Sequence, residues 1–584
     1  MPTRNTKIVC TLGPATAEQP TIERLIENGM SVARLNASHG TTENRADLIE
    51  TVRAASSAVG RSVAVMLDLP GPEIRTAPLD ESIELETGTE VRLSEGETAS
   101  PDAVGVSTSI GAVSPGDRVL LDDGRIETVV SRVEGETVVV DVESGGTLGG
   151  QKGVNVPGVD LDLESVTEQD RQELTLAADH DVDFVAASFV RDAEDIYAVN
   201  EALENQGADV PVVAKIERAG AVEHLDGIIE STYGVMVARG DLGVECPMET
   251  VPLVQKRIIQ KCRAAGVPVI TATEMLDSMT HARRPTRAEA TDVANAVLDG
   301  TDAVMLSGET AVGDHPARVV DAMSTIVGEV EASDEYTERN EQTVPKPGSA
   351  RTDGLARSAR YLARDVDATA IVAATESGYT ALKAAKYRPD VPVVAVTPSR
   401  QVCRHLALSA GVVPQFAPLT EREKSTDVVV QNAVQTAVDA GIVASGDSVV
   451  VLAGLMTDLE EANTTNMLKI HVAADIVASG RSIVEGVATG PLHHAEHGDL
   501  TSVPDGSVLT LPTDFDDEFT GEPSSLAGII SGHKGVTGYP AIVARELGIP
   551  MIGGVDLADL PKDVTVTLDA ERGVVYEGDI TGTR

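Results

Sequence analysis

The first half of the chain alternates short apolar runs, rich in β-branched residues, with longer amphipathic stretches. Short apolar runs bounded by turn residues predict buried strands, and apolar positions at helical spacing predict the segments that connect them. This alternation is typical of a parallel sheet with helical crossovers. Strands are predicted at 7–13, 32–38, 63–69, 184–190, 210–217, 234–241, 267–273 and 303–309, with helices at 21–28, 168–179, 194–206 and 288–298.

Eight strand–helix units favour a (β/α)8 barrel of the α/β class, formed by residues 1–72 and 156–335. In such a barrel the carboxyl ends of the strands meet at the rim that carries the active site. Seven of the predicted strands end in polar groups, which we therefore expect to converge: Asn36, Ser38, Asp68, Ser188, Lys215, Glu217, Arg239, Asp241, Thr273, Glu274 and Glu309.

Three further domains are predicted. Residues 73–155 show short strands and Gly-rich turns, which indicates a small β domain inserted as a lid at the rim. A polar linker with Pro345 and Pro347 follows the barrel, and 336–475 then read as a smaller α/β regulatory domain. Residues 476–584 return to Gly-punctuated strands and a helix at 541–547, as in an additional β/α domain of the swivelling kind.

Composition narrows the functional classes. The 584 residues carry a formal charge of −46, which disfavours binding to nucleic acid or to anionic membranes. No apolar run reaches the length of a spanning helix, and the four cysteines have neither disulfide nor zinc spacing. These features predict a soluble, cytoplasmic protein. With 34 Arg but only 12 Lys, the acidic surface also predicts adaptation to molar salt, where the Debye length is about 3 Å.

The strongest chemical signal comes from two neighbouring strands. Lys215 and Glu217 are two residues apart, so their side chains share one face of a strand, and Asp241 ends the next strand. Two carboxylates beside an ammonium can hold one Mg²⁺. The backbone N–H groups of 238–240 can bind a carboxylate or phosphate, which together suits phosphoryl transfer. A structural Lys–Glu pair is the simpler alternative.

A second cluster lies on the preceding strands. Asn36, Ser38 and Asp68 offer hard oxygen ligands for a monovalent or divalent cation, and Arg34 is expected to be free to bind a phosphoryl group. Helix capping and turn formation are the alternative roles for the first three.

Ten motifs together resemble those of pyruvate kinases, in order and across residues 4–475. They lie at 7–14, 33–40, 67–76, 152–157, 188–191, 214–217, 236–243, 270–276, 284–289 and 305–310. The resemblance implies transfer of a phosphoryl group from phosphoenolpyruvate to ADP. It makes Lys215, Arg34 and Thr273 catalytic, adds Ala238, Arg239, Gly240 and Asp241 as substrate-binding residues, and places Asn36, His39, Arg75 and Lys152 at the nucleotide. It assigns Mg²⁺ to Glu217 and Asp241, and K⁺ to Asn36, Ser38, Asp68 and the carbonyl of Leu69.

Some positions depart from the family pattern. Leu69 replaces a common Thr, but its carbonyl remains available; Pro70 stands where Lys is common, and Glu274 where Gln is common. Glu73 matches the family members that need potassium.

The resemblance also implies a homotetramer and an effector site. In the third domain Thr375, Ser377, Gly378 and Thr380 follow a predicted strand and could bind a phosphorylated effector, an ordinary strand–helix turn being the alternative. His493, His494 and His497 match no metal-ligand spacing and are predicted to lie in a polar loop.

The end of the chain resembles the phosphohistidine domain of phosphoenolpyruvate-utilising enzymes. In those enzymes a histidine is phosphorylated, and this chain has Tyr539 at the corresponding position, followed by Pro540. The nearest histidine, His533, lies six residues upstream. A phenol with a pKa near 10 is a poor nucleophile at neutral pH. We therefore expect a packing appendage.

Two rival functions remain at this point. A magnesium-dependent aldolase acting on pyruvate or oxaloacetate would use similar carboxylates, but it has no need of a lid or of Lys152. A catalytically inactive regulator would not need Lys215, Glu217, Asp241, Thr273 and Arg34 together.

Overall fold

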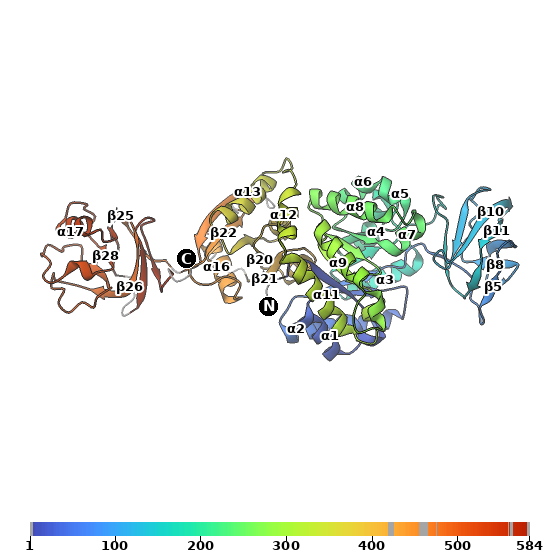
Figure 1. Ribbon diagram of the computed structural model, residues 1–584, viewed down its shortest axis with the longest axis horizontal. Helices are drawn as coiled ribbons and strands as arrows, with labels where there is room; N and C mark the ends of the chain where they lie inside the picture. Colours follow the sequence, from blue (N-terminus) through green and yellow to red (C-terminus); the bar gives the residue numbers. More distant parts are fainter. Residues whose placement is uncertain are drawn as a thin grey trace. The chain divides into compact units, whose positions relative to one another are not determined.

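The computed structural model describes residues 4–418, 426–454, 465–474, 476–558, 560 and 564–580. Its central element is a closed, parallel eight-stranded barrel in the order β1-β18-β17-β16-β15-β14-β3-β2, which confirms the predicted barrel (Figure 1). The strands are β1 (Lys7–Leu12), β2 (Met30–Asn36), β3 (Ala64–Asp68), β14 (Phe184–Ala187), β15 (Val212–Ile216), β16 (Gly234–Ala238), β17 (Val269–Ala272) and β18 (Ala303–Leu306).

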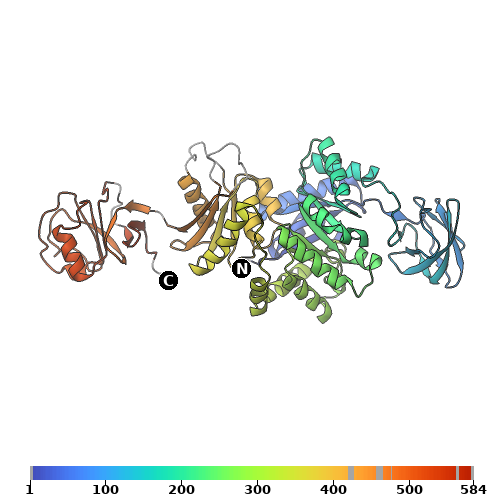
Figure 2. The same cartoon turned by 90° about the horizontal axis from the view of Figure 1, so that it is seen from above.

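Helices surround these strands, as both views of the barrel show (Figures 1 and 2). Apolar side chains of strands and helices form one core between them, while Val9, Met66, Phe184, Met236 and Met305 belong to a separate cluster formed mostly by barrel strands. The helices and 3-10 turns of this region are η1 (Pro14–Thr16), α1 (Gln19–Asn28), α2 (Thr42–Val59), α3 (Glu168–Asp179), α4 (Ala193–Asn205), α5 (Ala219–Glu223), α6 (Leu225–Ser231), α7 (Arg239–Glu245), α8 (Val251–Ala265), η2 (Asp277–Thr280), α9 (Arg287–Asp299), α10 (Gly308–Ala311) and α11 (Pro316–Glu331).

Residues 74–155, which lie between β3 and α3, form a separate small β structure with its own apolar core, which includes Val91, Val119 and Val138. One sheet has the order β4-β13-β9-β10-β11-β6-β8-β7, and β12 pairs with β5. The strands are β4 (Ile74–Arg75), β5 (Ile83–Leu85), β6 (Glu90–Glu95), β7 (Ala99–Ser100), β8 (Ala103–Val106), β9 (Arg118–Leu121), β10 (Ile126–Glu134), β11 (Thr137–Ser144), β12 (Gly146–Leu148) and β13 (Gly153–Asn155).

The segment after the barrel begins differently from the sequence prediction. Residues 336–342 are not linker but part of helix α12 (Asp334–Gln342), and only 343–350 lack a helix or strand. The Oγ of Ser333 caps this helix by accepting from the N–H of Tyr336 at 3.3 Å. Almost every residue of α12 is polar, so apolar periodicity could not reveal it, whereas the Ser cap followed by acidic residues could have.

A five-stranded sheet in the order β21-β20-β19-β22-β23 follows. Its first strands are parallel and connected by helices, while β22 and β23 pair antiparallel. The elements are α13 (Arg351–Asp365), β19 (Ala370–Ala374), α14 (Tyr379–Ala385), β20 (Val393–Thr397), α15 (Arg400–Leu406), β21 (Val412–Phe416), α16 (Thr426–Asp439), β22 (Ser448–Ala453) and β23 (Met467–Val472).

The last part of the chain forms a mixed sheet in the order β24-β31-β30-β26-β27-β28-β29-β25, with helix α17 (Tyr539–Leu547). His493 and His494 lie at the end of β26 rather than in the predicted loop, and His494 Nδ1 pairs with Thr510 Oγ1 at 2.8 Å. The remaining elements are β24 (Ile476–Ser479), β25 (Arg481–Val484), β26 (Val487–His494), β27 (Val508–Leu511), η3 (Pro523–Ser525), β28 (Gly528–Ser531), β29 (Met551–Gly553), β30 (Thr565–Asp569) and β31 (Val574–Glu577).

Candidate active site

The side chains of Lys215 and Glu217 lie together at the end of β15, as their spacing predicts. Lys215 Nζ is 2.8 Å from Glu217 Oε1, and the N–H of Phe189 donates to Glu217 Oε2 at 2.6 Å. Phe189 reaches this position with φ of 57°, a left-handed conformation that is unusual for a bulky residue. Both carboxylate oxygens of Glu217 are therefore held in place from two neighbouring strand ends.

The carboxylate of Asp68 lies between two cationic side chains, those of Arg34 and Lys215. Its Oδ2 accepts from Arg34 Nε at 2.6 Å, and its Oδ1 lies 3.2 Å from Lys215 Nζ. Burial alone would raise the pKa of the Asp68 carboxyl, but Arg34 and Lys215 outweigh it and lower that pKa. Burial opposes charge on Lys215 as well, yet Asp68 and Glu217 raise its pKa above the ordinary value. These shifts favour the charged forms of both Asp68 and Lys215.

Arg34 is not free, contrary to the expectation from the sequence. Besides its bond to Asp68, its Nη1 donates to Thr11 Oγ1 at 3.0 Å. These contacts orient the guanidinium, and among the described residues no contact is found for Nη2.

Ser188 was expected at the rim from the sequence, but without a role in the site. Its Oγ accepts from Lys215 Nζ at 2.7 Å and donates to the carbonyl of Leu69 at 2.7 Å. Ser188 lies within the predicted strand at 184–190 and directly follows the observed β14, which ends at Ala187. One hydroxyl therefore links the Lys215 ammonium to the end of β3.

Asp241 lies in the first turn of α7, directly after β16. Burial and the neighbouring Glu217 raise the pKa of Asp241 to about 7. The carboxylates of Glu217 and Asp241 repel each other, and the nearby charge of Lys215 does not fully compensate this repulsion and the burial of Asp241. This donor set fits a hard divalent cation that also binds substrate oxygens.

Thr273 and Glu274 follow β17 with φ of 66° and 53°, both in the left-handed region. The carbonyl of Thr273 accepts from Arg239 Nη2 at 2.6 Å, and its Oγ1 accepts from the N–H of Gly240 at 2.8 Å. Backbone strain of this kind persists only where surrounding contacts impose it. The Gly240 amide, predicted to bind a substrate carboxylate, is thus already occupied by Thr273.

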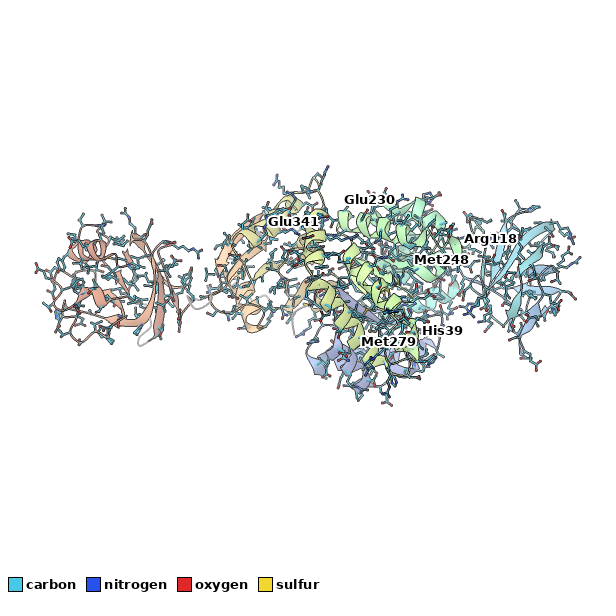
Figure 3. The ribbon with its side chains drawn as sticks, in the orientation of Figure 1. His39, Arg118, Glu230, Met248, Met279 and Glu341 are labelled. Atoms are coloured by element: carbon cyan, nitrogen blue, oxygen red, sulfur yellow. The ribbon has the colours of Figure 1, made fainter. Side chains whose placement is uncertain are left out.

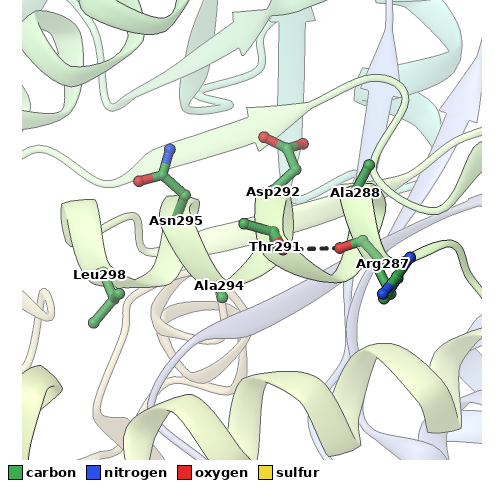
Figure 4. A pocket seen from close by; sticks show the side chains of 7 residues that line it. All are labelled: Arg287, Ala288, Thr291, Asp292, Ala294, Asn295 and Leu298. Atoms are coloured by element: carbon green, nitrogen blue, oxygen red, sulfur yellow. Dashed lines mark hydrogen bonds between the residues drawn. The ribbon is translucent and has the colours of Figure 1, made fainter.

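The guanidinium of Arg239 is held by the end of β17 and by Asp292 of α9. Its Nη1 pairs with Asp292 Oδ2 at 2.6 Å and its Nε donates to the carbonyl of Ala272 at 3.0 Å. Asp292 belongs to a groove of about 740 Å³ along α9, within which Thr291 Oγ1 donates to the carbonyl of Arg287 (Figure 4). The side chain of Arg239 therefore positions the Thr273 turn, which leaves only its backbone for a ligand. The groove is lined by Arg287, Ala288, Thr291, Asp292, Ala294, Asn295 and Leu298.

The predicted cation ligands come from adjacent strands. Asn36 and Asp68 are register partners on β2 and β3, and Asn36 Oδ1 accepts from the N–H of Ser38 at 3.2 Å. The Leu69 carbonyl accepts from Ser188, as described above. Strand pairing thus brings Asn36 and Asp68 side by side, with Ser38 and Leu69 following them in the chain.

The predicted nucleotide residues are more exposed. Lys152 Nζ lies 3.0 Å from Asp122 Oδ1, and Arg75 Nη2 lies 2.7 Å from Glu73 Oε2. His39, labelled in Figure 3, is in the turn after β2. Its carbonyl accepts from Arg45 Nη1 at 2.7 Å. The side chains of Arg75 and Lys152 are 39% and 40% exposed, although Asp122 itself is buried. Arg75 and Lys152 are therefore accessible to an anionic ligand from solution.

The predicted effector residues form a local turn. Thr375 Oγ1 accepts from the N–H of Gly378 at 3.0 Å, and Thr380 Oγ1 pairs with Thr465 Oγ1 at 2.8 Å. Both threonines are buried, whereas Ser377 is exposed. The two threonine hydroxyls therefore support the strand–helix turn in this arrangement.

In the C-terminal extension, neither Tyr539 nor His533 is arranged to accept a phosphoryl group. Tyr539 begins α17 and its ring lies 5.7 Å from that of Phe519. His533 Nδ1 accepts from the N–H of Gly535 at 2.9 Å, so the lone pair of that nitrogen is already engaged. Within the described residues no group of three or more His, Cys, Asp or Glu side chains could hold a metal.

Three family models match the chain: the pyruvate kinase barrel domain over residues 3–320, the pyruvate kinase alpha/beta domain over 353–471, and the mobile domain of PEP-utilising enzymes over 503–573. The chain belongs to the pyruvate kinase family. A pyruvate kinase of Bacillus licheniformis is 42% identical over 587 residues, covering 98% of this chain and 99% of its own. One from Staphylococcus aureus strain MRSA252 is 42% identical over 584 residues, with the same coverage.

These relatives share the whole length of the chain, so the C-terminal extension is common to them. The chain is accordingly a phosphotransferase of this family. In the part of the chain that the structure describes, no helix has the length and apolar character needed to cross a membrane.

Proposed function

We propose that the chain transfers the phosphoryl group of phosphoenolpyruvate to ADP, giving pyruvate and ATP, as a glycolytic enzyme of the cytoplasm. The observation that carries the proposal is the arrangement of Arg34 and Lys215 on the two oxygens of Asp68, beside Glu217 and Asp241. Phosphoryl transfer is mostly positioning and charge neutralisation, and two fixed cations at one strand edge supply both.

Lys215 would neutralise the charge that develops on the phosphoryl group in flight, and Arg34 would hold that group through its Nη2. Because Asp68 and Ser188 fix the Lys215 ammonium, it needs no reorientation during transfer. Thr273 would lie beside the enolpyruvate carbon that receives a proton, which the left-handed turn at 273–274 positions. The backbone of 238–240, and Asp241 next to it, would face the substrate carboxylate, for which the Gly240 N–H would have to leave Thr273 Oγ1.

Glu217 and Asp241 would hold Mg²⁺. The raised pKa of Asp241 supports this role, because it indicates a carboxylate pair with too little positive charge around it. When bound, Mg²⁺ would draw negative charge from the phosphate oxygens. The contacts of Lys215 and of the Phe189 amide with Glu217 orient that carboxylate for the ion.

Asn36, Ser38, Asp68 and the carbonyl of Leu69 would hold K⁺. Their oxygen atoms come from the ends of two paired strands, and oxygen donors suit a hard monovalent cation. Glu73 is consistent with a requirement for potassium. His39, Arg75, Lys152 and Asn36 would face the nucleotide, the lysine from the hinge at which the inserted β domain rejoins the barrel.

The proposal extends to regulation and habitat. Residues 375–380, with Ser377 exposed, would bind a phosphorylated effector, and the enzyme would be a homotetramer, as the family resemblance implies. The charge of −46 would make it a salt-adapted enzyme that needs screening by salt.

A coupled assay for ATP formed from ADP and phosphoenolpyruvate tests the main proposal. We expect ATP formation that requires Mg²⁺, whereas a pyruvate or oxaloacetate aldolase would cleave its substrate without a nucleotide. Replacing KCl by NaCl at equal ionic strength separates the two roles of potassium. Screening is retained in NaCl, so the fold should persist, while occupancy of the site at Asn36 and Asp68 is lost and activity should fall. Full activity in dilute, potassium-free buffer would exclude both roles.

A further inference from the structure

A small cavity lies between the C-terminal end of α8 and the segment 382–409. Its volume is about 10 Å³, which corresponds to a single water-sized species. It contains none of the residues assigned to catalysis, nucleotide or effector. Its lining is formed by Arg263, Gly266, Val267, Pro268, Asp302, Leu382, Ala385, Lys386, Arg388 and Ser409.

Two of these side chains carry buried polar atoms without a protein partner. Arg263 is 6% exposed; its Nη1 donates to Thr343 Oγ1 at 2.8 Å, but its Nε and Nη2 have no partner among the described residues. Ser409 is completely buried, and its Oγ likewise has none in the described part of the chain. Buried donors left unsatisfied are costly, most of all on a charged group, so a ligand is expected here.

The charges around the cavity do not balance. Lys386 Nζ pairs with Asp353 Oδ1 at 3.0 Å, and Arg388 Nη1 pairs with Asp302 Oδ1 at 3.0 Å. The other oxygen of Asp302 accepts from the backbone N–H of Val269 at 3.1 Å. Each of these two carboxylates is thus in an ion pair with another cation. Asp302 and Tyr336 lie near enough to Arg263 to offset part of its unfavourable environment, but no ion pair among the described residues includes Arg263.

Burial, and next the nearby Arg388, lower the pKa of Arg263 to about 9. A guanidinium resists deprotonation, so this direction expresses an unfavourable environment for its charge rather than a neutral side chain. A negative charge in the cavity would relieve both the desolvation and the repulsion.

We propose that the cavity binds one monoatomic anion of the halide class, chloride in ordinary salt, between Arg263 and Ser409. The anion accepts hydrogen bonds from Nε and Nη2 of Arg263 and from the hydroxyl of Ser409. The volume admits a single atom and excludes a tetrahedral phosphate or sulfate. The site connects α8 of the barrel to the segment 382–409, so its occupancy stabilises the fold and does not depend on the proposed reaction.

Crystals of the full chain soaked in potassium bromide test the site directly, because bromide scatters anomalously. We expect an anomalous peak within hydrogen-bond distance of Arg263 Nε and Ser409 Oγ. A water molecule without anomalous signal at that position, in crystals that bind bromide elsewhere, overturns the proposal.

Thermal unfolding tests it in solution. Potassium glutamate is exchanged for KCl at constant potassium concentration, so that screening and the cation stay the same. We expect the unfolding temperature of the natural chain to rise by several degrees and then level off as the chloride concentration increases. The variant Arg263→Gln should lose this response. Arg257→Gln, an exposed change on the same helix, should keep it.

Ser409→Ala provides a second variant if Arg263→Gln does not fold. It removes one donor and retains the charge, so the chloride concentration for half of the response should increase several-fold. A chloride response that is unchanged in Arg263→Gln, or in Ser409→Ala when that is the only variant that folds, refutes the site.

Discussion

Two buried cations of the same barrel, Lys215 and Arg263, have opposite electrostatic situations. Lys215 is 9% exposed and lies 3.2 Å from Asp68 and 2.8 Å from Glu217. Arg263 is 6% exposed, but its one described hydrogen bond is to the neutral hydroxyl of Thr343. Burial lowers the pKa of both, yet the carboxylates reverse the shift for Lys215, while Arg388 adds to it for Arg263.

The difference shows that burial does not decide the state of a charged group; the position of the counter-charge does. At the rim, the protein itself supplies the carboxylates, and the ammonium is ready before substrate arrives. At the cavity between the end of α8 and the segment 382–409, Arg263 has no carboxylate in an ion pair with it among the described residues, and we infer that an anion from solution supplies the negative charge. The following predictions alter the counter-charges or the contacts on which this comparison depends.

Removal of the rim cation should have the largest effect. Lys215→Ala deletes the charge that stabilises the phosphoryl group in flight, so kcat should fall about 1,000-fold. Mg²⁺ binding should persist, because Glu217 and Asp241 remain. Steady-state kinetics and calorimetric titration with Mg²⁺ measure the two separately.

The matched control is Lys261→Ala, which removes a lysine paired with the exposed Asp226 on the outside of the barrel. Its kcat should stay at the natural value. A Lys215→Ala enzyme with near-normal kcat would remove this residue from the mechanism.

Asp68→Asn should have the largest effect on stability. It leaves Arg34 and Lys215 facing an amide, and breaking one side of a buried charge cluster costs about 3–5 kcal/mol. Urea unfolding at fixed KCl concentration measures the loss. Asp226→Asn, an exposed carboxylate in an ion pair with Lys261, should change stability by about 0.5 kcal/mol at most. Equal losses in both variants would mean that Asp68 has no special role.

The same carboxylate predicts an acid-sensitive part of the stability. Because the pKa of Asp68 is lowered in the folded protein, its contribution is complete above the ordinary Asp pKa and is lost as pH falls through the lowered value. The free energy of unfolding should therefore decline less steeply with acid in Asp68→Asn than in the natural chain. Parallel pH profiles for the two proteins would contradict this assignment.

Ser188→Ala should have a smaller effect. The Lys215 ammonium loses one hydrogen bond but keeps both carboxylates, so kcat should fall about tenfold, equivalent to about 1.4 kcal/mol. Ser131→Ala, which removes a hydroxyl contact with the Val139 carbonyl in the inserted β domain, is the control and should leave kcat unchanged. A Ser188→Ala enzyme that retains full kcat would show that the carboxylates alone position the ammonium.

The C-terminal extension should contribute least to the chemistry. Ending the chain after Ala474 should leave kcat within about a factor of two, because no residue of the extension is proposed to touch substrate. Incubation of the full chain with labelled phosphoenolpyruvate in the absence of ADP should give no acid-labile phosphoprotein. Stoichiometric label on His533 or Tyr539 would give the extension a role in phosphoryl transfer.

The sequence by itself determined the barrel and much of the rim. Apolar runs of strand length located all eight barrel strands, and a spacing of two placed Lys215 and Glu217 on one face, since side chains alternate along a strand. Apolar periodicity did not predict the helix α12, whose residues are almost all polar, or the strand position of His494 on β26. Such a prediction needs a regular pattern of apolar residues.

The tertiary structure alone decided which side chains satisfy one another. Only strand register brings Ser188 to Lys215 and turns Arg34 onto Asp68, and only the packing of 382–409 against α8 places Arg388 near Arg263. Periodicity depends on neighbours a few residues apart, whereas these contacts join residues 27 to 125 positions apart in the sequence. Counter-charges at such separations depend on how the elements pack, and the local pattern contains no information about them.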